Sequence, residues 1–181
     1  MRSSCRAGSR RRRLYQMKIK FLTTGGTIDK VYFDAKSEFE VGSPQVLAVL
    51  QDANVTFEFE VESLLRKDSL ELSDADRQLI RQHVEVEPIP QIVITHGTDT
   101  MIQTARALGG IPGKTIVLTG SMQPARFRTT DAVFNIGVAI GCVQSLPTGV
   151  YIAMNGQVFD PHRVRKNRDR NCFEPIPDPP R

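Results

Sequence analysis

The chain has 181 residues, of which 40% are hydrophobic and 24% are charged. This length and composition predict one globular domain with its own core and exclude a wholly disordered chain. No apolar run approaches the roughly 20 residues that a membrane-spanning helix needs. With no Trp and 7% aromatic residues, a base-stacking surface is not expected either. We therefore expect neither a membrane nor a nucleic acid as partner.

The formal net charge of +4 is concentrated at the amino end. Residues 1–16 carry six arginines and no acidic residue, which leaves 18 basic against 20 acidic residues in 17–181, a sum of −2. We expect 1–16 to be a disordered Arg-rich tail. Its composition also loosely fits a mitochondrial transit peptide. A start codon assigned too far upstream, with Met17 as the true start, would explain the segment equally well. Three cysteines without a CxxC pair indicate a reducing compartment, so a cytoplasmic location is expected.

From Met17 onward, strand-like and helix-like runs alternate along the chain. Strands are expected at 18–23, 55–61, 91–95, 114–119 and 150–153. Helices are expected after Pro44, after a capping Ser73, at 99–108 and at 130–143. The strict alternation of V-T-F-E-F-E-V places the 55–61 strand near a sheet edge.

This order predicts an α/β fold: a single Rossmann-like or flavodoxin-like domain with a mainly parallel sheet and helices on both faces. The domain is expected to occupy 17–170, followed by a Pro-rich tail at 171–181. The charged, Pro-rich segment beyond Asn155 has room for a short hairpin but too few apolar residues for a second core.

Ligands of open α/β sheets bind beyond the carboxyl ends of the strands. Four segments follow such ends here: TTGGTID, KDS, HGTDT and GSMQP. The first lacks both the GxGxxG spacing and the GK[ST] ending of nucleotide loops, so it reads either as a ligand loop of another kind or as a plain glycine turn. In the third, Asp99 could simply cap the next helix. However, Thr98 precedes it and Lys114 opens the next strand, and a Thr–Lys–Asp set could activate a hydroxyl or a water.

Five motifs together resemble the bacterial-type L-asparaginase family: TTGGTID (23–29), HGTDTM (96–101), KTIVLTGSMQP (114–124), DAVFN (131–135) and GVYIAMNGQVFD (149–160). The resemblance covers about residues 17–170. It implies an amidohydrolase that converts L-asparagine to L-aspartate and ammonia through a threonine acyl-enzyme. It implies no cofactor and no metal, and the three histidines lack ligand spacing.

The resemblance also implies roles for individual residues. Thr27 would form the acyl-enzyme, and Thr98, Asp99 and Lys114 would form the second catalytic set. Two positions compete for the tyrosine that assists the first threonine. Phe39 fits the family spacing but lacks a hydroxyl, whereas Tyr32 has one on the same loop, and we predict Tyr32.

Four further residues are expected to bind the substrate. Asp68 would face the substrate α-ammonium, and Ser69 or a backbone N–H would face its α-carboxylate. Gly26 and Gly97 would border the substrate, and backbone N–H groups near Gly25–Thr27 and Thr98 are candidate oxyanion donors.

Long members of the family are about twice this length, and their smaller C-terminal domain sends an acidic residue into a neighbouring subunit's site. This sequence stops where that domain would start, so it is either a natural short form or a truncated, inactive fragment. The retained Thr27, Tyr32, Thr98, Asp99 and Lys114 favour the natural short form, which we expect to be a homodimer or a higher homo-oligomer. Other readings stay open: a non-catalytic amino-acid-binding module, a mixed glutaminase and asparaginase, or part of an amidotransferase. The acidic balance of 17–181 argues against the last one acting alone.

Overall fold

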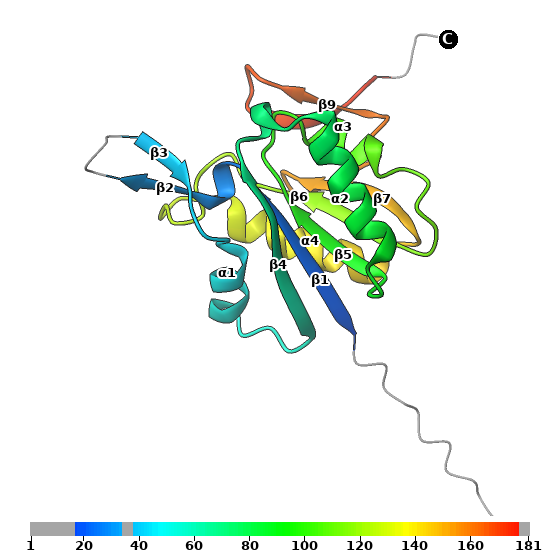
Figure 1. Cartoon of the computed structure of the whole chain (residues 1–181). Helices are drawn as coiled ribbons and strands as arrows, with labels where there is room; N and C mark the ends of the chain where they lie inside the picture. The colour runs from blue at the N-terminus through cyan, green and yellow to red at the C-terminus, as the bar shows by residue number, and fades with distance from the viewer. Residues whose placement is uncertain (1–16, 34–37, 178–181) are drawn as a thin grey trace, which may run out of the picture.

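The computed structural model describes residues 17–33 and 38–177, with the backbone alone for 32, 33 and 38–40. Its centre is a six-stranded sheet in the order β4-β1-β5-β6-β7-β8 (Figure 1). The strands are, in that order, Glu58–Lys67, Lys18–Gly25, Gln91–Thr95, Thr115–Thr119, Gly149–Met154 and Gln157–Phe159. The first five run parallel and β8 runs antiparallel to β7. The expected α/β fold is confirmed, with β4 at the edge.

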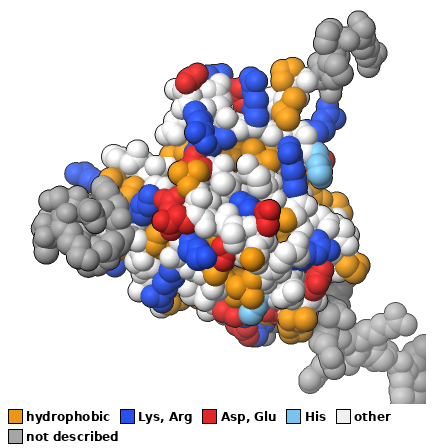
Figure 2. Space-filling view, turned by 45° about the horizontal axis from the view of Figure 1, so that its top comes forward, with side chains coloured by type: hydrophobic (Ala, Val, Ile, Leu, Met, Phe, Trp, Pro, Cys, Tyr) orange, Lys and Arg blue, Asp and Glu red, His pale blue; other side chains and the backbone are white. Residues whose placement is uncertain are grey.

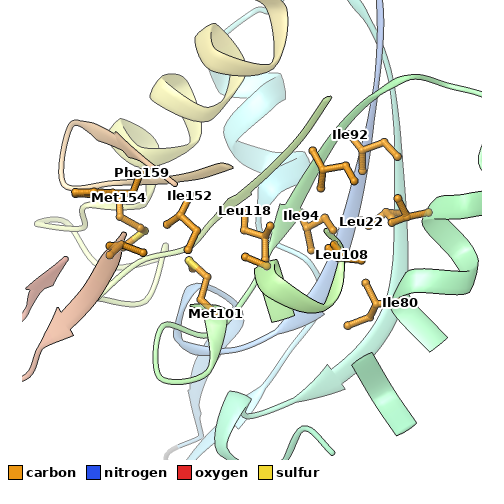
Figure 3. Packing of buried hydrophobic residues seen from close by; sticks show 14 of the residues in the cluster. Leu22, Ile80, Ile92, Ile94, Met101, Leu108, Leu118, Ile152, Met154 and Phe159 are labelled. Atoms are coloured by element: carbon orange, nitrogen blue, oxygen red, sulfur yellow. The ribbon is translucent and has the colours of Figure 1, made fainter. Parts of the chain in front are cut away.

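Helices cover both faces of the sheet because side chains alternate along each strand. Leu22 of β1 packs in a cluster with α2 (Asp74–Val86) and α3 (Met101–Ala107). Figure 3 shows part of this cluster, with Leu118 between Met101 and Ile94. Phe21, on the other face, packs in a second cluster with α1 (Val46–Asp52) and α4 (Ala132–Ser145).

Local sequence signals place several element boundaries. Ser73 accepts a hydrogen bond from the Asp76 backbone N–H while the Asp76 carboxylate accepts one from the Ser73 N–H, so α2 begins at the predicted capping box. The next helix begins at Met101 rather than at 99, and its N-cap is Thr100. Asp99 is therefore not the cap, which leaves its carboxylate for another role.

A short hairpin occupies the loop that was expected between Thr27 and Pro44. Strands β2 (Lys30–Phe33) and β3 (Glu38–Val41) pair antiparallel, outside the main sheet, and extend from the side of the molecule (Figure 1). Asp29 closes the base of this hairpin. Its backbone oxygen accepts from Gly42 N at 2.8 Å and its carboxylate accepts from Gln45 N at 2.8 Å.

A second hairpin extends the domain past the boundary expected at residue 170. Strands β9 (Val164–Asn167) and β10 (Cys172–Pro175) pair antiparallel, and Val164 and Phe173 are buried in the first core cluster. Val164 and Phe173, one from each strand, thus anchor in the core a segment that is otherwise charged and Pro-rich. The tail expected at 1–16 lies outside the described residues. Within the described ranges, none of the helices is long and apolar enough to cross a membrane.

Candidate active site

Three loops meet in direct contact beyond the carboxyl ends of β1, β4 and β5. A Cβ added to Gly26 would lie 2.4 Å from the Gly97 Cα, and one added to Gly97 would lie 2.5 Å from the Ser69 Cβ. Gly26 also has a φ of +91°, which L side chains rarely adopt. Glycine is needed at both positions because any side chain would push these loops apart. The structure therefore brings together Gly26, Gly97, Ser69 and the residues next to them.

The fully buried His96 stabilises the loop after β5 through two hydrogen bonds. Its Nδ1 lies 2.7 Å from the Gly97 backbone oxygen and its Nε2 lies 2.9 Å from the Thr104 hydroxyl. A carbonyl can only accept, so Nδ1 carries the proton and Nε2 accepts from the hydroxyl. Burial lowers the pKa of His96 to about 4 despite its hydrogen bond to Gly97. The imidazole is neutral near pH 7 and acts as a fixed support for the turn that carries Thr98.

Lys166 joins Thr98 and Asp99 into one cluster. Its Nζ donates to the Thr98 hydroxyl oxygen at 2.7 Å and to the Asp99 carboxylate at 2.9 Å. Arg168 approaches the same carboxylate oxygen of Asp99 at 3.8 Å. The Lys166 side chain is 13% exposed, which makes these interactions stronger than those of a surface pair. A hydroxyl, a carboxylate and an ammonium thus meet at the edge where a ligand is expected.

The β9–β10 hairpin explains why Lys166 points into the site. Residues 164 and 166 lie on the same face of a strand, and Val164 is anchored in the core, so Lys166 is directed inward with it. Arg165 faces the opposite way and pairs with Glu174 on the neighbouring strand. Sequence reasoning allowed a short hairpin in this charged segment but assigned the lysine of the site to Lys114, and so it missed Lys166. The spacing of Val164 and Phe173 was the available signal.

Lys114 does not join this cluster, which corrects the expectation from sequence. It precedes the first residue of β6, and β6 pairs in register with β5 from Thr115 opposite Gln91 to Thr119 opposite Thr95. Thr98 follows the other end, about 16 Å along the strand direction at roughly 3.3 Å per residue. The Lys114 ammonium instead donates to the backbone oxygens of Glu87 and Ile89. Lys114 thereby supplies hydrogen-bond donors to the backbone oxygens of the segment that follows α2.

Thr27 begins a short 3-10 helix (η1, Thr27–Asp29) directly after Gly26, and it is half-buried beside the three-loop contact. Tyr32 and Phe39, the two competing positions for the assisting tyrosine, are register partners across β2 and β3. Their side chains lie outside the described part of the structure. The backbone places the two positions opposite each other on the hairpin, so it does not decide between them.

Asp68 and Ser69 lie where the segment after β4 was expected to meet substrate. The Ser69 backbone oxygen accepts from the Thr100 hydroxyl at 2.6 Å, which ties this segment to the loop after β5. The Asp68 carboxylate is already paired with Lys30, at 2.7 Å. Partial burial alone would raise the pKa of Asp68, but the hydrogen bonds from Lys30 and from the Leu70 backbone outweigh it and lower that pKa.

Charges of both signs are interspersed on the face that Figure 2 brings forward. Across the part of the chain that the structure describes, no group of three or more His, Cys, Asp and Glu residues could hold a metal ion. The chemistry available at this edge is that of hydroxyls, backbone N–H groups and paired lysines and carboxylates.

Comparison with known proteins identifies the class that this fold and site define. The sequence profile of the family described as "Asparaginase, N-terminal" matches residues 18–180. The chain belongs to the asparaginase family.

Named relatives fall into three kinds. An L-asparaginase of Thermococcus kodakarensis is 32% identical over 174 residues, which cover 88% of this chain and 51% of the relative. Its solved structure superposes with a TM-score of 0.77 over 90% of this chain and 52% of that one. A glutaminase-asparaginase of Acinetobacter glutaminasificans is 30% identical, with 82% and 49% covered. A component of the glutamyl-tRNA(Gln) amidotransferase of Thermoplasma acidophilum is also 30% identical, with 90% and 44% covered. The chain thus spans about half the length of the relatives it matches.

Proposed function

We propose that the chain is an amidohydrolase that converts L-asparagine to L-aspartate and ammonia through an ester with Thr27. The observation that carries the proposal is the contact of Lys166 with Thr98 and Asp99, at the strand end next to the Thr27 loop. Membership of the asparaginase family supports the same reaction.

In the first step, the Thr27 hydroxyl oxygen attacks the carbon of the side-chain amide. A threonine hydroxyl is a weak nucleophile at neutral pH and needs a group that accepts its proton. Tyr32 is the proposed relay, and the proton passes on to the amide nitrogen. The C–N bond breaks, ammonia leaves, and the aspartyl group remains as an ester on Thr27. Backbone N–H groups at Gly26, Thr27 and Thr98 are the proposed donors to the oxyanion.

In the second step, a water hydrolyses the ester. Because the Thr98 oxygen accepts from Lys166 at 2.7 Å, its own hydrogen is free to bind the water or the ester carbonyl. The water oxygen forms the new C–O bond, Thr27 regains its proton, and the product carboxylate leaves. Asp99 keeps the Lys166 ammonium directed at Thr98. One amide and one water yield one carboxylic acid and one ammonia.

The test is ammonia release from L-asparagine by the purified chain, in wild type and in the variants Thr27→Ala and Thr98→Ala. We expect each variant to lower kcat by several orders of magnitude, since each removes a group that acts in the transition state. Thr100→Ala is the matched control. The Thr100 hydroxyl bonds to a backbone oxygen in the neighbouring loop, so its loss is expected to change kcat far less than the loss of Thr98.

If Thr27→Ala and Thr98→Ala both keep near-full activity, the proposed mechanism is wrong. If the wild type releases no ammonia but binds L-asparagine, the alternative of a non-catalytic amino-acid-binding module is favoured. Release of ammonia from L-glutamine at a comparable rate would instead favour the mixed specificity that the name of the Acinetobacter relative describes.

A further inference from the structure

The hairpin that carries Lys166 is held at a further point besides its apolar anchors. The side-chain oxygen of Asn155 accepts a hydrogen bond from the Phe173 backbone N–H at 2.8 Å. Phe173 on β10 is the register partner of Lys166 on β9. Asn155, in the turn between β7 and β8, therefore contacts the hairpin directly opposite the lysine of the site.

The hydrogen-bond pattern of the hairpin directs the Phe173 N–H toward Asn155. The Ile176 N–H donates to the Arg163 backbone oxygen at 2.9 Å, and hydrogen-bonded and non-hydrogen-bonded pairs alternate along an antiparallel ladder. The pair of Phe173 and Lys166 is therefore non-hydrogen-bonded, and the Phe173 N–H points away from β9. In such a pair the two Cα atoms are only about 4.5 Å apart, so a shift of Phe173 passes to Lys166.

Asn155 is itself fixed by a buried amide. Its backbone N–H donates to the side-chain oxygen of Asn135 at 3.1 Å. The Asn135 nitrogen donates to the Gly120 backbone oxygen at 3.0 Å and to the Asp131 carboxylate at 2.9 Å. Asn135 lies on α4 and is 1% exposed. Reorienting a buried amide that is bonded at both ends would cost it these partners, so Asn135 keeps the turn in place.

The conformation of the turn does not by itself require asparagine at 155. Asn155 and Gly156 have φ values of +54° and +76° and join the antiparallel strands β7 and β8. Asn and Gly both tolerate this left-handed conformation, and both are common in two-residue hairpin turns. Glycine at 155 would therefore keep the turn, whereas asparagine adds the acceptor for the Phe173 N–H.

Apolar packing and this hydrogen bond restrain the hairpin in different ways. The side chain of Phe173 is buried in the core, but burial of apolar surface is non-directional. A hydrogen bond is restricted in both distance and angle, so the Asn155 contact fixes where Phe173 lies on the core. The Lys166 ammonium donates to Thr98 at 2.7 Å and to Asp99 at 2.9 Å. Both of these bonds depend on the placement of β9.

Resting on the proposed amidohydrolase function, we propose that Asn155 is a positioning residue for Lys166. It holds the backbone of Phe173, and with it β9, at the place from which the Lys166 ammonium reaches the Thr98 hydroxyl. Asn155 thus acts through Lys166 and not on the substrate.

Two substitutions at 155 and one control isolate the acceptor. Asn155→Gly keeps the left-handed backbone and removes the acceptor, whereas Asn155→Asp keeps both. Asn54→Gly is the matched control. Asn54 has a φ of +49°, and its side chain donates to the Asp52 backbone oxygen in the turn after α1.

We expect kcat for L-asparagine to fall about 10- to 100-fold in Asn155→Gly, because a displacement of about 1 Å can cost on the order of 100-fold. In Asn155→Asp and Asn54→Gly, kcat is expected to stay within about threefold of wild type, and KM is expected to change by less than about threefold in all three variants. An unchanged kcat in Asn155→Gly would overturn the proposal. An equal loss in Asn155→Asp or in Asn54→Gly would also overturn it.

A double-mutant cycle with Lys166→Met separates positioning from a general loss of structure. If Asn155 acts through Lys166, the loss of kcat caused by Asn155→Gly shrinks to less than about threefold in the Lys166→Met background. A contribution to the fold alone would lower kcat by the same factor in both backgrounds, and that result would refute the positioning role.

NMR spectroscopy of the Lys166 side chain gives a readout that does not depend on turnover. The Cε resonance of Lys166, assigned by its loss in Lys166→Met, is expected to shift in Asn155→Gly and to keep its wild-type position in Asn155→Asp and Asn54→Gly. If no amide is hydrolysed and this pattern is found, the proposed function fails while the positioning role stands. If amides are hydrolysed and Asn155→Gly changes neither kcat nor the resonance, the function stands and the inference about Asn155 fails.

Discussion

The ammonium of Lys166 lies 2.7 Å from the hydroxyl oxygen of Thr98, although the two residues are 68 positions apart in the chain. Lys114, which is much nearer in sequence to Thr98, bonds two backbone oxygens at the opposite end of the sheet. These two lysines therefore have separable roles, one in the site and one in the fold.

Substituting each lysine by methionine distinguishes these roles. We expect Lys166→Met to lower kcat/KM for L-asparagine by about 100-fold or more, because Thr98 loses the charge that polarises it. Lys114→Met is expected to keep kcat within threefold but to lower the free energy of unfolding by roughly 1–3 kcal/mol, since the partly buried backbone oxygens of Glu87 and Ile89 lose their donor. Ammonia assays and urea titrations of both proteins measure the two effects. The reverse ranking would show that the lysine expected from the sequence is the functional one.

The identity of the assisting tyrosine is tested on the β2–β3 hairpin. Tyr32→Phe removes a single hydroxyl and is expected to nearly abolish turnover while the circular dichroism spectrum stays that of wild type. Phe39→Leu, at the register partner of Tyr32, is expected to change KM modestly. Steady-state kinetics of the two variants decide between the positions, and a larger loss in Phe39→Leu would contradict the assignment.

The stability of the chain is expected to depend on pH through Asp29. Burial raises the pKa of Asp29 from 3.8 to about 6, even though hydrogen bonding to Gln45 opposes the rise. The native state therefore binds a proton more tightly than the unfolded state. The stabilisation that this proton provides is present below about pH 3.8 and is lost as the pH rises through about 6, by roughly 3 kcal/mol in total.

Asp29→Asn removes this titration and keeps the oxygen that accepts from Gln45. The free energy of unfolding of the variant minus that of wild type is expected to rise by roughly 2–2.5 kcal/mol between pH 4 and pH 7.5, because at pH 4 part of the stabilisation is already lost. Urea titrations at several pH values measure this difference, in which the titration of His96 cancels because both proteins contain it. A difference that is independent of pH would contradict the raised pKa.

Selectivity for asparagine over glutamine is expected from the geometry of attack. One extra methylene lengthens the tether between the α-groups and the amide, which moves the amide carbon away from Thr27. A displacement of about 1 Å can lower the rate on the order of 100-fold. We expect a millimolar KM for L-asparagine, and kcat/KM for L-glutamine at least tenfold lower than for L-asparagine. Comparable values for the two substrates would show that the pocket does not fix the tether length.

Self-association is expected from the resemblance to an oligomeric family, and α4 offers a surface for a second copy. Val133 and Phe134 are 54% and 60% exposed on this helix, and large exposed apolar side chains that lie together are typical of interfaces. Sedimentation of wild type should show a dimer or a larger species, and Phe134→Lys should shift it toward monomer. A wild type that is fully active as a monomer at assay concentration would contradict this expectation.

The sequence by itself determined the fold class, the order of the parallel strands in the chain and the loops at their carboxyl ends. These features depend on local patterns: alternating side chains, a capping box at Ser73, and glycines beside threonines after strands. Thr98 and Asp99 were singled out because they lie in the loop that follows a strand, whereas the role expected of Thr27 came from the resemblance to the asparaginase family.

Tertiary structure alone decided which charged groups meet. The Lys166 contact depends on the β9–β10 hairpin, which Val164 and Phe173 anchor in a core assembled from distant parts of the chain. The Lys30–Asp68 pair likewise joins two different loops. Ion pairs between long side chains carry no periodic signal, and their partners are fixed only once the backbone has folded. For this reason the sequence could place a lysine beside Thr98 and Asp99 as chemistry requires, while packing determined that it is Lys166 and not Lys114.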